Sequence, residues 1–133
     1  MQALYIPASN ETPEIHFDYA SHQLAIRGES YPENAMSFYA PVRASLQSYL
    51  EAGHGGAPIR VEIALRYFNS ASTKLIRALV AMLNATAVAG RKVILDWHHD
   101  AEDDMMIEFG QDLSEEHNAI EFHAVAQAEA CAA

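Results

Sequence analysis

The segment IRVEIALRYFNSASTKLIRALV, residues 59–80, changes its hydrophobic period halfway along. Its first half alternates apolar and polar side chains, which is the period of a β-strand with one buried face; the apolar positions are Ile59, Val61, Ile63, Leu65 and Tyr67. Its second half has the spacing of an amphipathic helix, with apolar residues at Leu75, Ile76, Leu79, Val80 and Leu83. The segment therefore predicts a strand that runs into a helix through a polar turn.

The polar turn spans residues 69–73 and reads Asn-Ser-Ala-Ser-Thr. Asn69, Ser70 and Ser72 are each suitable as the N-cap of the following helix, because their side-chain oxygens accept hydrogen bonds from free backbone N–H groups. These residues alone leave the function open, since a serine at a helix start commonly serves as a cap.

The residues before this segment predict an edge strand, a hairpin and a helix. A short strand is expected around Leu4 to Ile6, and the alternation over residues 15–26, with a turn at 20–22, is typical of a β-hairpin. A long helix is expected over residues 35–52, where Asn34 is a cap and Gly53 a left-handed stop. Pro41 indicates that this helix either starts nearer Phe38 or is kinked.

The residues after this segment continue the alternation of strands and helices. The second helix is expected to end near Gly90, and a strand follows over residues 93–97. Asp100 is the expected cap of a third helix, whose apolar residues are Met105, Met106, Phe109 and Leu113. A last strand spans 120–125. This order predicts an α/β fold in one domain, residues 1–126, with an N-terminal hairpin and a mostly parallel central sheet covered by helices. Residues 127–133 are expected to form a disordered tail.

Composition restricts the classes of function. The 133 residues carry a formal net charge of −10, which argues against nucleic acid as a partner. No apolar run approaches the roughly 20 residues of a membrane span, and we expect a cytoplasmic protein without a membrane partner. The single cysteine, Cys131, gives neither a disulfide framework nor a cysteine metal site.

Charge is also distributed unevenly along the chain. Six of the eight Lys and Arg residues lie between positions 60 and 92, whereas the residues from Asp96 onward contain eleven acids and no Lys or Arg. Two interpretations stay open for this acidic part: a solvated helix face, or a docking surface for a basic partner.

Catalysis and metal binding are poorly supported by residue spacing. His98 and His99 would point to opposite faces of a strand, so they do not favour a shared metal ion. A nucleophilic Ser70 needs a base nearby, and the sequence places none of the seven histidines beside it. The glycine-rich stretch 53–58 lacks a phosphate-loop pattern. We therefore expect no catalytic residue, no metal and no cofactor.

Two motifs give the chain a family resemblance. They are Gly-Glu-Ser-Tyr-Pro-Glu-Asn at 28–34 and Tyr-Phe-Asn-Ser at 67–70, the latter with Ser72 and Lys74; Leu-Asp-Trp-His-His-Asp at 95–100 is a weaker match. With these motifs the chain resembles the SiaC family of bacterial regulatory phosphoproteins, small STAS-like domains that act as partner-switching adaptors.

The resemblance implies a protein without catalytic activity of its own. In its unphosphorylated form it would bind and activate a diguanylate cyclase, and so control cyclic di-GMP signalling and biofilm or aggregation behaviour. A dedicated Ser/Thr kinase and a PP2C-type phosphatase would set its phosphorylation state. The rival function is that of a STAS-like domain that binds a small metabolite or a lipid.

The resemblance also implies the site residues. The acceptor follows the Asn of a Tyr-x-Asn motif, which makes Ser70 the expected phosphoacceptor. The chain has Ser70 where Thr is usual and Ala71 where Ser is usual, so Ser72 and Thr73 stay alternatives. Because both motifs precede helices at the carboxyl ends of strands, they are expected to share one partner surface. Its residues are Ser30, Tyr31, Pro32, Glu33, Asn34, Tyr67, Asn69, Ser72 and Lys74.

Overall fold

A computed structural model describes residues 3–127. Along this part of the chain the strands are β1 (Leu4–Ile6), β2 (Glu14–Asp18), β3 (Gln23–Ser30), β4 (Ile59–Phe68), β5 (Val93–Asp100) and β6 (Glu121–Gln127). The helices are α1 (Ala35–Ala52), α2 (Ser70–Val88) and α3 (Asp104–Glu116), with a short 3-10 helix at His54–Gly56. The predicted order of elements is confirmed.

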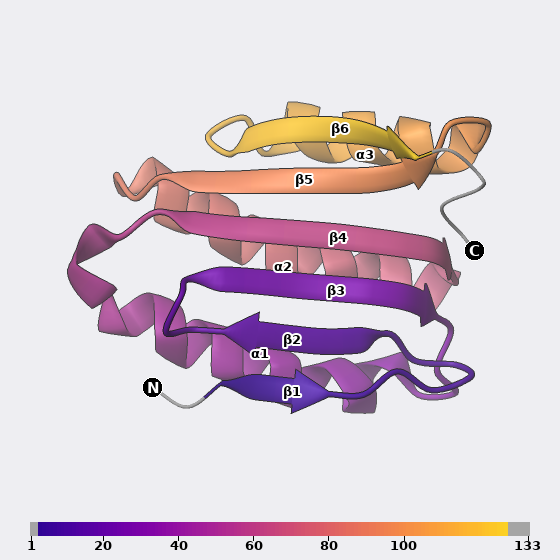
Figure 1. Ribbon diagram of the computed structural model, residues 1–133, viewed down its shortest axis with the longest axis horizontal. Coiled ribbons are helices and arrows are strands. Elements are labelled where there is room, and N and C mark those ends of the chain that lie inside the picture. The colour runs from indigo at the N-terminus through magenta and orange to yellow at the C-terminus, as the bar shows by residue number, and fades with distance from the viewer. Residues whose placement is uncertain (1–2, 128–133) are drawn as a thin grey trace.

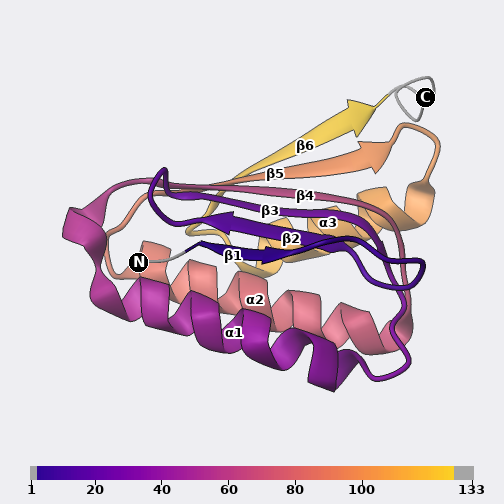
Figure 2. The same ribbon diagram turned by 60° about the horizontal axis from the view of Figure 1, so that its bottom comes forward.

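The six strands form one mixed sheet in the order β1-β2-β3-β4-β5-β6. Strands β1, β2 and β3 pair antiparallel, and β3, β4, β5 and β6 pair parallel. Each parallel strand lies next to its predecessor, so right-handed crossovers that all step in one direction bring every helix to the same face. Figure 1 looks onto the sheet with the helices behind it, and Figure 2 shows the same helices along one side.

The core lies between the sheet and the helices. Along β4 the alternation predicted from the sequence buries Ile59, Val61, Ile63 and Leu65. Trp97 of β5 packs so closely on α3 that a Cβ on Gly110 would lie 2.6 Å from the Cδ1 atom of Trp97. Position 110 therefore requires glycine for space, although its backbone is helical. The opposite face of the sheet carries polar side chains and is not covered by any of the three helices.

The start of the third helix differs from the prediction. Asp100 is the last residue of β5, because that strand stays paired with β6 as far as Gln127. The cap is Asp103, whose Oδ1 atom accepts a hydrogen bond of 3.1 Å from the Met106 backbone N–H. Met105, predicted on the apolar face, is 84% exposed, whereas Met106 is buried. Consecutive helical residues point about 100° apart, so the two methionines cannot share a face.

Two further expectations concerned the start of α1 and the start of the C-terminal tail. The Asn34 side chain accepts from the Ser37 N–H, and α1 begins at Ala35, which leaves Pro41 inside the helix. Pro41 is exposed, so the Ser37 carbonyl that it deprives of a donor lies on the solvent side of α1. Strand β6 includes Gln127, and the rest of the predicted tail, residues 128–133, lies outside the described residues.

Candidate functional site

The carboxyl edge of the parallel sheet brings the two sequence motifs together. Ser30 at the end of β3 pairs in register with Phe68 at the end of β4. The Asn69 backbone N–H then donates to the Ser30 carbonyl at 2.9 Å. The rings of Tyr31 and Tyr67 meet at a centroid distance of 5.7 Å. The predicted adjacency of the two segments is thus confirmed.

A bulge near the end of β4 directs Tyr67 outward. Gly28 pairs with Leu65 and Glu29 pairs with Tyr67, so Arg66 is an extra residue in β4. A bulge shifts the alternation of faces by one position. Tyr67, predicted on the buried face, is therefore 52% exposed, and Phe68 packs against Phe109 instead, with ring centroids 4.9 Å apart. The exposure of Tyr67 corrects the prediction from simple alternation.

The turn after β4 is held by Asn69. Its Oδ1 atom accepts from the Ser72 backbone N–H at 2.9 Å, which makes Asn69 the N-cap of α2. Ser70 is consequently the first residue of the helix and not its cap. Its side chain is exposed, and no hydrogen bond to its hydroxyl is found within residues 3–127. An accessible hydroxyl at this position is suited to modification.

The neighbouring hydroxyls are engaged in the fold. Ser72 is 0% exposed; its hydroxyl donates to the Ser30 carbonyl at 3.0 Å and accepts from the Ser30 hydroxyl at 2.8 Å. The Tyr39 hydroxyl lies 2.7 Å from the Ser30 Oγ, and because the Ser30 proton goes to Ser72, Tyr39 is the donor. Thr73 is half-buried and donates to the Asn69 carbonyl at 3.1 Å. These bonds favour Ser70 over Ser72 and Thr73 as the acceptor.

The buried hydroxyls form a short chain beneath the turn. Burial raises the pKa of Tyr39 to about 12, and the hydrogen bond to Ser30 opposes this rise only in part. Tyr39 therefore stays neutral and keeps donating at physiological pH. Ser30 and Ser72, expected at the partner surface, lie under it, so their contribution to any partner is to position the turn above them.

Of the remaining residues predicted at the partner surface, most are exposed and one is buried. Tyr31, Glu33 and Lys74 are exposed, whereas Pro32 is buried beneath the loop. Asn34 is exposed and caps α1 with its side chain. Lys74 has no ion pair within residues 3–127. The exposed members at this edge thus include one aromatic ring, one acidic side chain and one lysine without an ion pair.

The exposure of two methionines at this edge was not predicted from the sequence. Met36 is 72% exposed in the first turn of α1, and Met105 is 84% exposed in the first turn of α3. All three helices begin at the carboxyl edge, so Met36 and Met105 lie in the first turns of the helices that precede and follow α2 in the chain. For Met36, its position outside the apolar stripe of α1 was the available signal. Met105 had been predicted on the apolar face of α3, where Met106 is the buried methionine. Methionine adapts its shape readily and is common on surfaces that contact several partners.

The histidines of the weaker motif take up structural contacts. The His98 Nδ1 atom lies 2.9 Å from the Gln127 amide nitrogen, and the His99 Nδ1 lies 2.9 Å from the Asp100 carbonyl oxygen. Among residues 3–127, no three His, Cys, Asp or Glu side chains gather in a way that would hold a metal ion. Both histidines thus make hydrogen bonds at the ends of β5 and β6.

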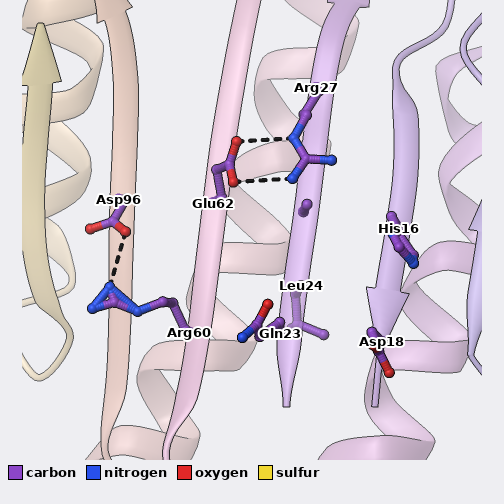
Figure 3. A pocket seen from close by; sticks show the side chains of 9 residues that line it. His16, Asp18, Gln23, Leu24, Arg27, Arg60, Glu62 and Asp96 are labelled. Carbon is purple, nitrogen blue, oxygen red and sulfur yellow. Dashed lines mark hydrogen bonds and ion pairs between the residues drawn. The ribbon is translucent and has the colours of Figure 1, made fainter. Parts of the chain in front are cut away.

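The uncovered sheet face carries a small polar hollow of about 120 Å³. It is lined by paired charges: Arg27 donates to Glu62 through Nε at 3.0 Å and Nη2 at 3.2 Å, and Arg60 donates to Asp96 at 3.3 Å (Figure 3). The Arg27 guanidinium holds the pKa of Glu62 below its ordinary value. Ligand pockets usually measure about 300–1,000 Å³ and are mostly apolar, so this hollow does not favour a lipid or metabolite ligand.

Comparison with known proteins finds relatives in sequence and in fold. A curated protein of Pseudomonas aeruginosa (strain UCBPP-PA14) is 29% identical over 116 residues, which cover 87% of this chain and 90% of the relative. The crystal structure of apo-SiaC from P. aeruginosa superposes with a TM-score of 0.87 at 28% identity, covering 95% of this chain and 100% of the other. None of the helices within the described residues is both long and apolar enough to cross a membrane.

A further structural neighbour was solved together with a partner. It is SiaC of P. aeruginosa in complex with the diguanylate cyclase SiaD, which it activates; the TM-score is 0.81 at 28% identity, over 95% of this chain and 99% of that one. The sequence profile of the SiaC family regulatory phosphoproteins matches residues 6–127. The chain therefore belongs to the SiaC family of regulatory phosphoproteins.

Proposed function

We propose that this chain is a non-catalytic switch protein that binds and activates a diguanylate cyclase while Ser70 is unphosphorylated. A Ser/Thr kinase and a PP2C-type phosphatase set the state of Ser70, and cyclic di-GMP production follows that state. The observation that carries this proposal is the exposed Ser70 hydroxyl at the head of α2, beside the exposed rings of Tyr31 and Tyr67. The SiaD complex of the structural neighbour supports the class of partner.

The physical basis of the switch is a difference between two energies. A phosphate adds about 1.5–2 negative charges, and at a helix N-terminus it is stabilised by about 0.3–1 kcal/mol. Juxtaposing like charges or burying an unmatched charge at a partner surface costs several kcal/mol. Each 1.4 kcal/mol changes affinity about tenfold. Phosphorylation thus leaves the domain folded and releases its partner.

The test begins with the partner and the acceptor. Unphosphorylated protein used as bait is expected to capture a diguanylate cyclase from its own cells, identified by mass spectrometry. Incubation with the cognate kinase is expected to label Ser70, and Ser70→Ala to abolish the label. Full labelling of Ser70→Ala, with the phosphate on Ser72 or Thr73, would contradict the assignment of the acceptor.

Calorimetric titration against the captured cyclase then tests the switch. Ser70→Ala is expected to bind as the wild type does, Ser70→Asp about tenfold more weakly, and phosphorylated protein more weakly still, since Asp carries one charge and the phosphate nearly two. Ser48→Asp is the matched control, because Ser48 is exposed on α1 far from the turn and receives the same charge. Equal affinities for the Ala, Asp and phosphorylated forms would show that charge at position 70 does not control the partner.

A further inference from the structure

Lys74 is exposed and lacks an ion pair within residues 3–127, although the chain is rich in acids. With 18 Asp and Glu residues against eight Lys and Arg, carboxylates are abundant. Five of the cations are ion-paired: Arg27, Arg60, Arg66, Arg77 and Lys92. Arg91 is buried and donates to Tyr49 and to a backbone carbonyl. Within residues 3–127, this leaves Lys74 and Arg43 as exposed cations without an ion pair.

The position of Lys74 relates it to Ser70. The two residues are four apart on α2 and both are exposed, so they lie on one face of the helix, a turn apart. The first turn of α2 contains no acid that would compete for the ammonium group. A negative group placed four residues before a lysine on a helix is the favourable orientation for an ion pair.

The other cations near Ser70 have partners of their own. Arg77, further along α2, pairs with Glu116 of α3. Arg66, before the turn, lies 3.9 Å from Glu29 at the edge of β3. Lys74 is therefore the nearby cation that can pair with a new anion without breaking an existing ion pair.

We propose that Lys74 is the internal partner of phosphorylated Ser70, and that it contacts a carboxylate of the cyclase when Ser70 is unmodified. Phosphorylation then acts in two ways: it adds negative charge at the surface, and it draws the Lys74 ammonium group away from the docked protein. The contact between Lys74 and the cyclase rests on the proposed function. The pairing of Lys74 with the phosphate does not depend on it.

The first test needs no partner protein. Phosphoserine is placed at position 70 by genetic code expansion, and the phosphate is titrated with pH by ³¹P NMR. In Lys74→Gln the titration midpoint is expected to lie about 0.3 pH units higher than in the wild type, because a nearby ammonium favours the dianion. Arg43→Gln, which removes the other unpaired exposed cation on a different helix, is expected to leave the midpoint unchanged. Identical midpoints for wild type and Lys74→Gln would overturn the pairing.

The second test uses the cyclase. Unphosphorylated Lys74→Gln is expected to bind about threefold more weakly than the wild type, as for an exposed ion pair, and phosphorylation is expected to weaken its binding by a smaller factor. Wild-type affinity in Lys74→Gln, or an unchanged phosphorylation factor, would overturn the role of Lys74 at the interface. Failure of the wild type to bind any cyclase would instead contradict the proposed function, with the NMR result still deciding the pairing.

Discussion

The two edges of the parallel sheet use their polar side chains in opposite ways. At the amino edge Arg91 is buried; its Nε donates to the Ala57 carbonyl and its Nη2 to the Tyr49 hydroxyl, each at 2.6 Å. At the carboxyl edge Lys74 is exposed, and the Tyr67 ring is half in solvent. The polar groups of Arg91 at the amino edge thus stabilise the fold, whereas Lys74 and Tyr67 at the carboxyl edge are left exposed to solvent.

The largest effect that we expect is a loss of stability when the buried arginine of the amino edge is replaced. Arg91→Leu should lower the free energy of unfolding by about 2–3 kcal/mol, because the Ala57 carbonyl and the Tyr49 hydroxyl lose a buried charged donor. Urea denaturation measures this change. Lys92→Gln, at the exposed neighbour, should stay within about 0.5 kcal/mol. A loss below about 1 kcal/mol in Arg91→Leu would remove the contrast between the edges.

The next effect should appear in binding and not in stability. Tyr31→Ala is expected to weaken cyclase binding about tenfold, because exposed aromatic side chains near the centre of an interface carry much of its energy. Its unfolding free energy should change by no more than about 0.5 kcal/mol. Tyr5→Ala, which removes an exposed ring that contacts His16 at the edge of the sheet, is the control. Unchanged cyclase affinity in folded Tyr31→Ala would exclude Tyr31 from the partner surface.

The smallest effect tests the buried support beneath the carboxyl edge. Tyr39→Phe should cost about 1 kcal/mol, since Ser30 loses a donor but still donates to Ser72. Folding raises the pKa of Tyr39 from 10.0 to about 12, so the folded state binds this proton more tightly. Tyr39 therefore contributes stability below pH 10 that is lost as the pH rises toward 12.

The pH dependence sharpens this prediction. Unfolding followed by circular dichroism between pH 9 and pH 12 should show a shallower alkaline loss of stability in Tyr39→Phe than in the wild type. Tyr19 and Tyr49 also have raised pKa values through burial, so part of the alkaline loss should remain. Identical alkaline slopes in both proteins would mean that Tyr39 does not supply this dependence.

Periodicity predicted the fold better than it predicted the surface of the site. The strand and helix of residues 59–80 follow from two clear hydrophobic periods, and the Asn34 cap follows from side-chain chemistry. The exposure of Tyr67 was not predictable, because the extra residue in β4 depends on pairing with β3. The cap at Asp103 was likewise missed, since pairing with β6 prolongs β5 beyond its alternating residues.

The roles of the three hydroxyls also required tertiary structure. Ser70, Ser72 and Thr73 are equivalent candidates in a sequence, because each lies in the same short turn. Ser72 differs because Ser30, which is distant in sequence and also bonded to Tyr39, binds its hydroxyl. Thr73 differs because its hydroxyl donates to the Asn69 carbonyl. The family resemblance selected Ser70, and the hydrogen bonds give a physical reason for that choice.

The extra residue in β4 also controls which way the chain faces as it leaves the sheet. Because Arg66 is unpaired, Tyr67 and Phe68 lie on the faces opposite to those that simple alternation would give them. If Arg66 were instead paired as a regular residue of β4, the environments of Tyr67 and Phe68 would be exchanged, which would place a hydroxyl in the core and a hydrophobic ring in water. Because α2 starts two residues after Phe68, the direction of Ser70 depends on the same bulge. One backbone irregularity thus sets the orientation of the segment that carries Tyr67, Phe68 and Ser70.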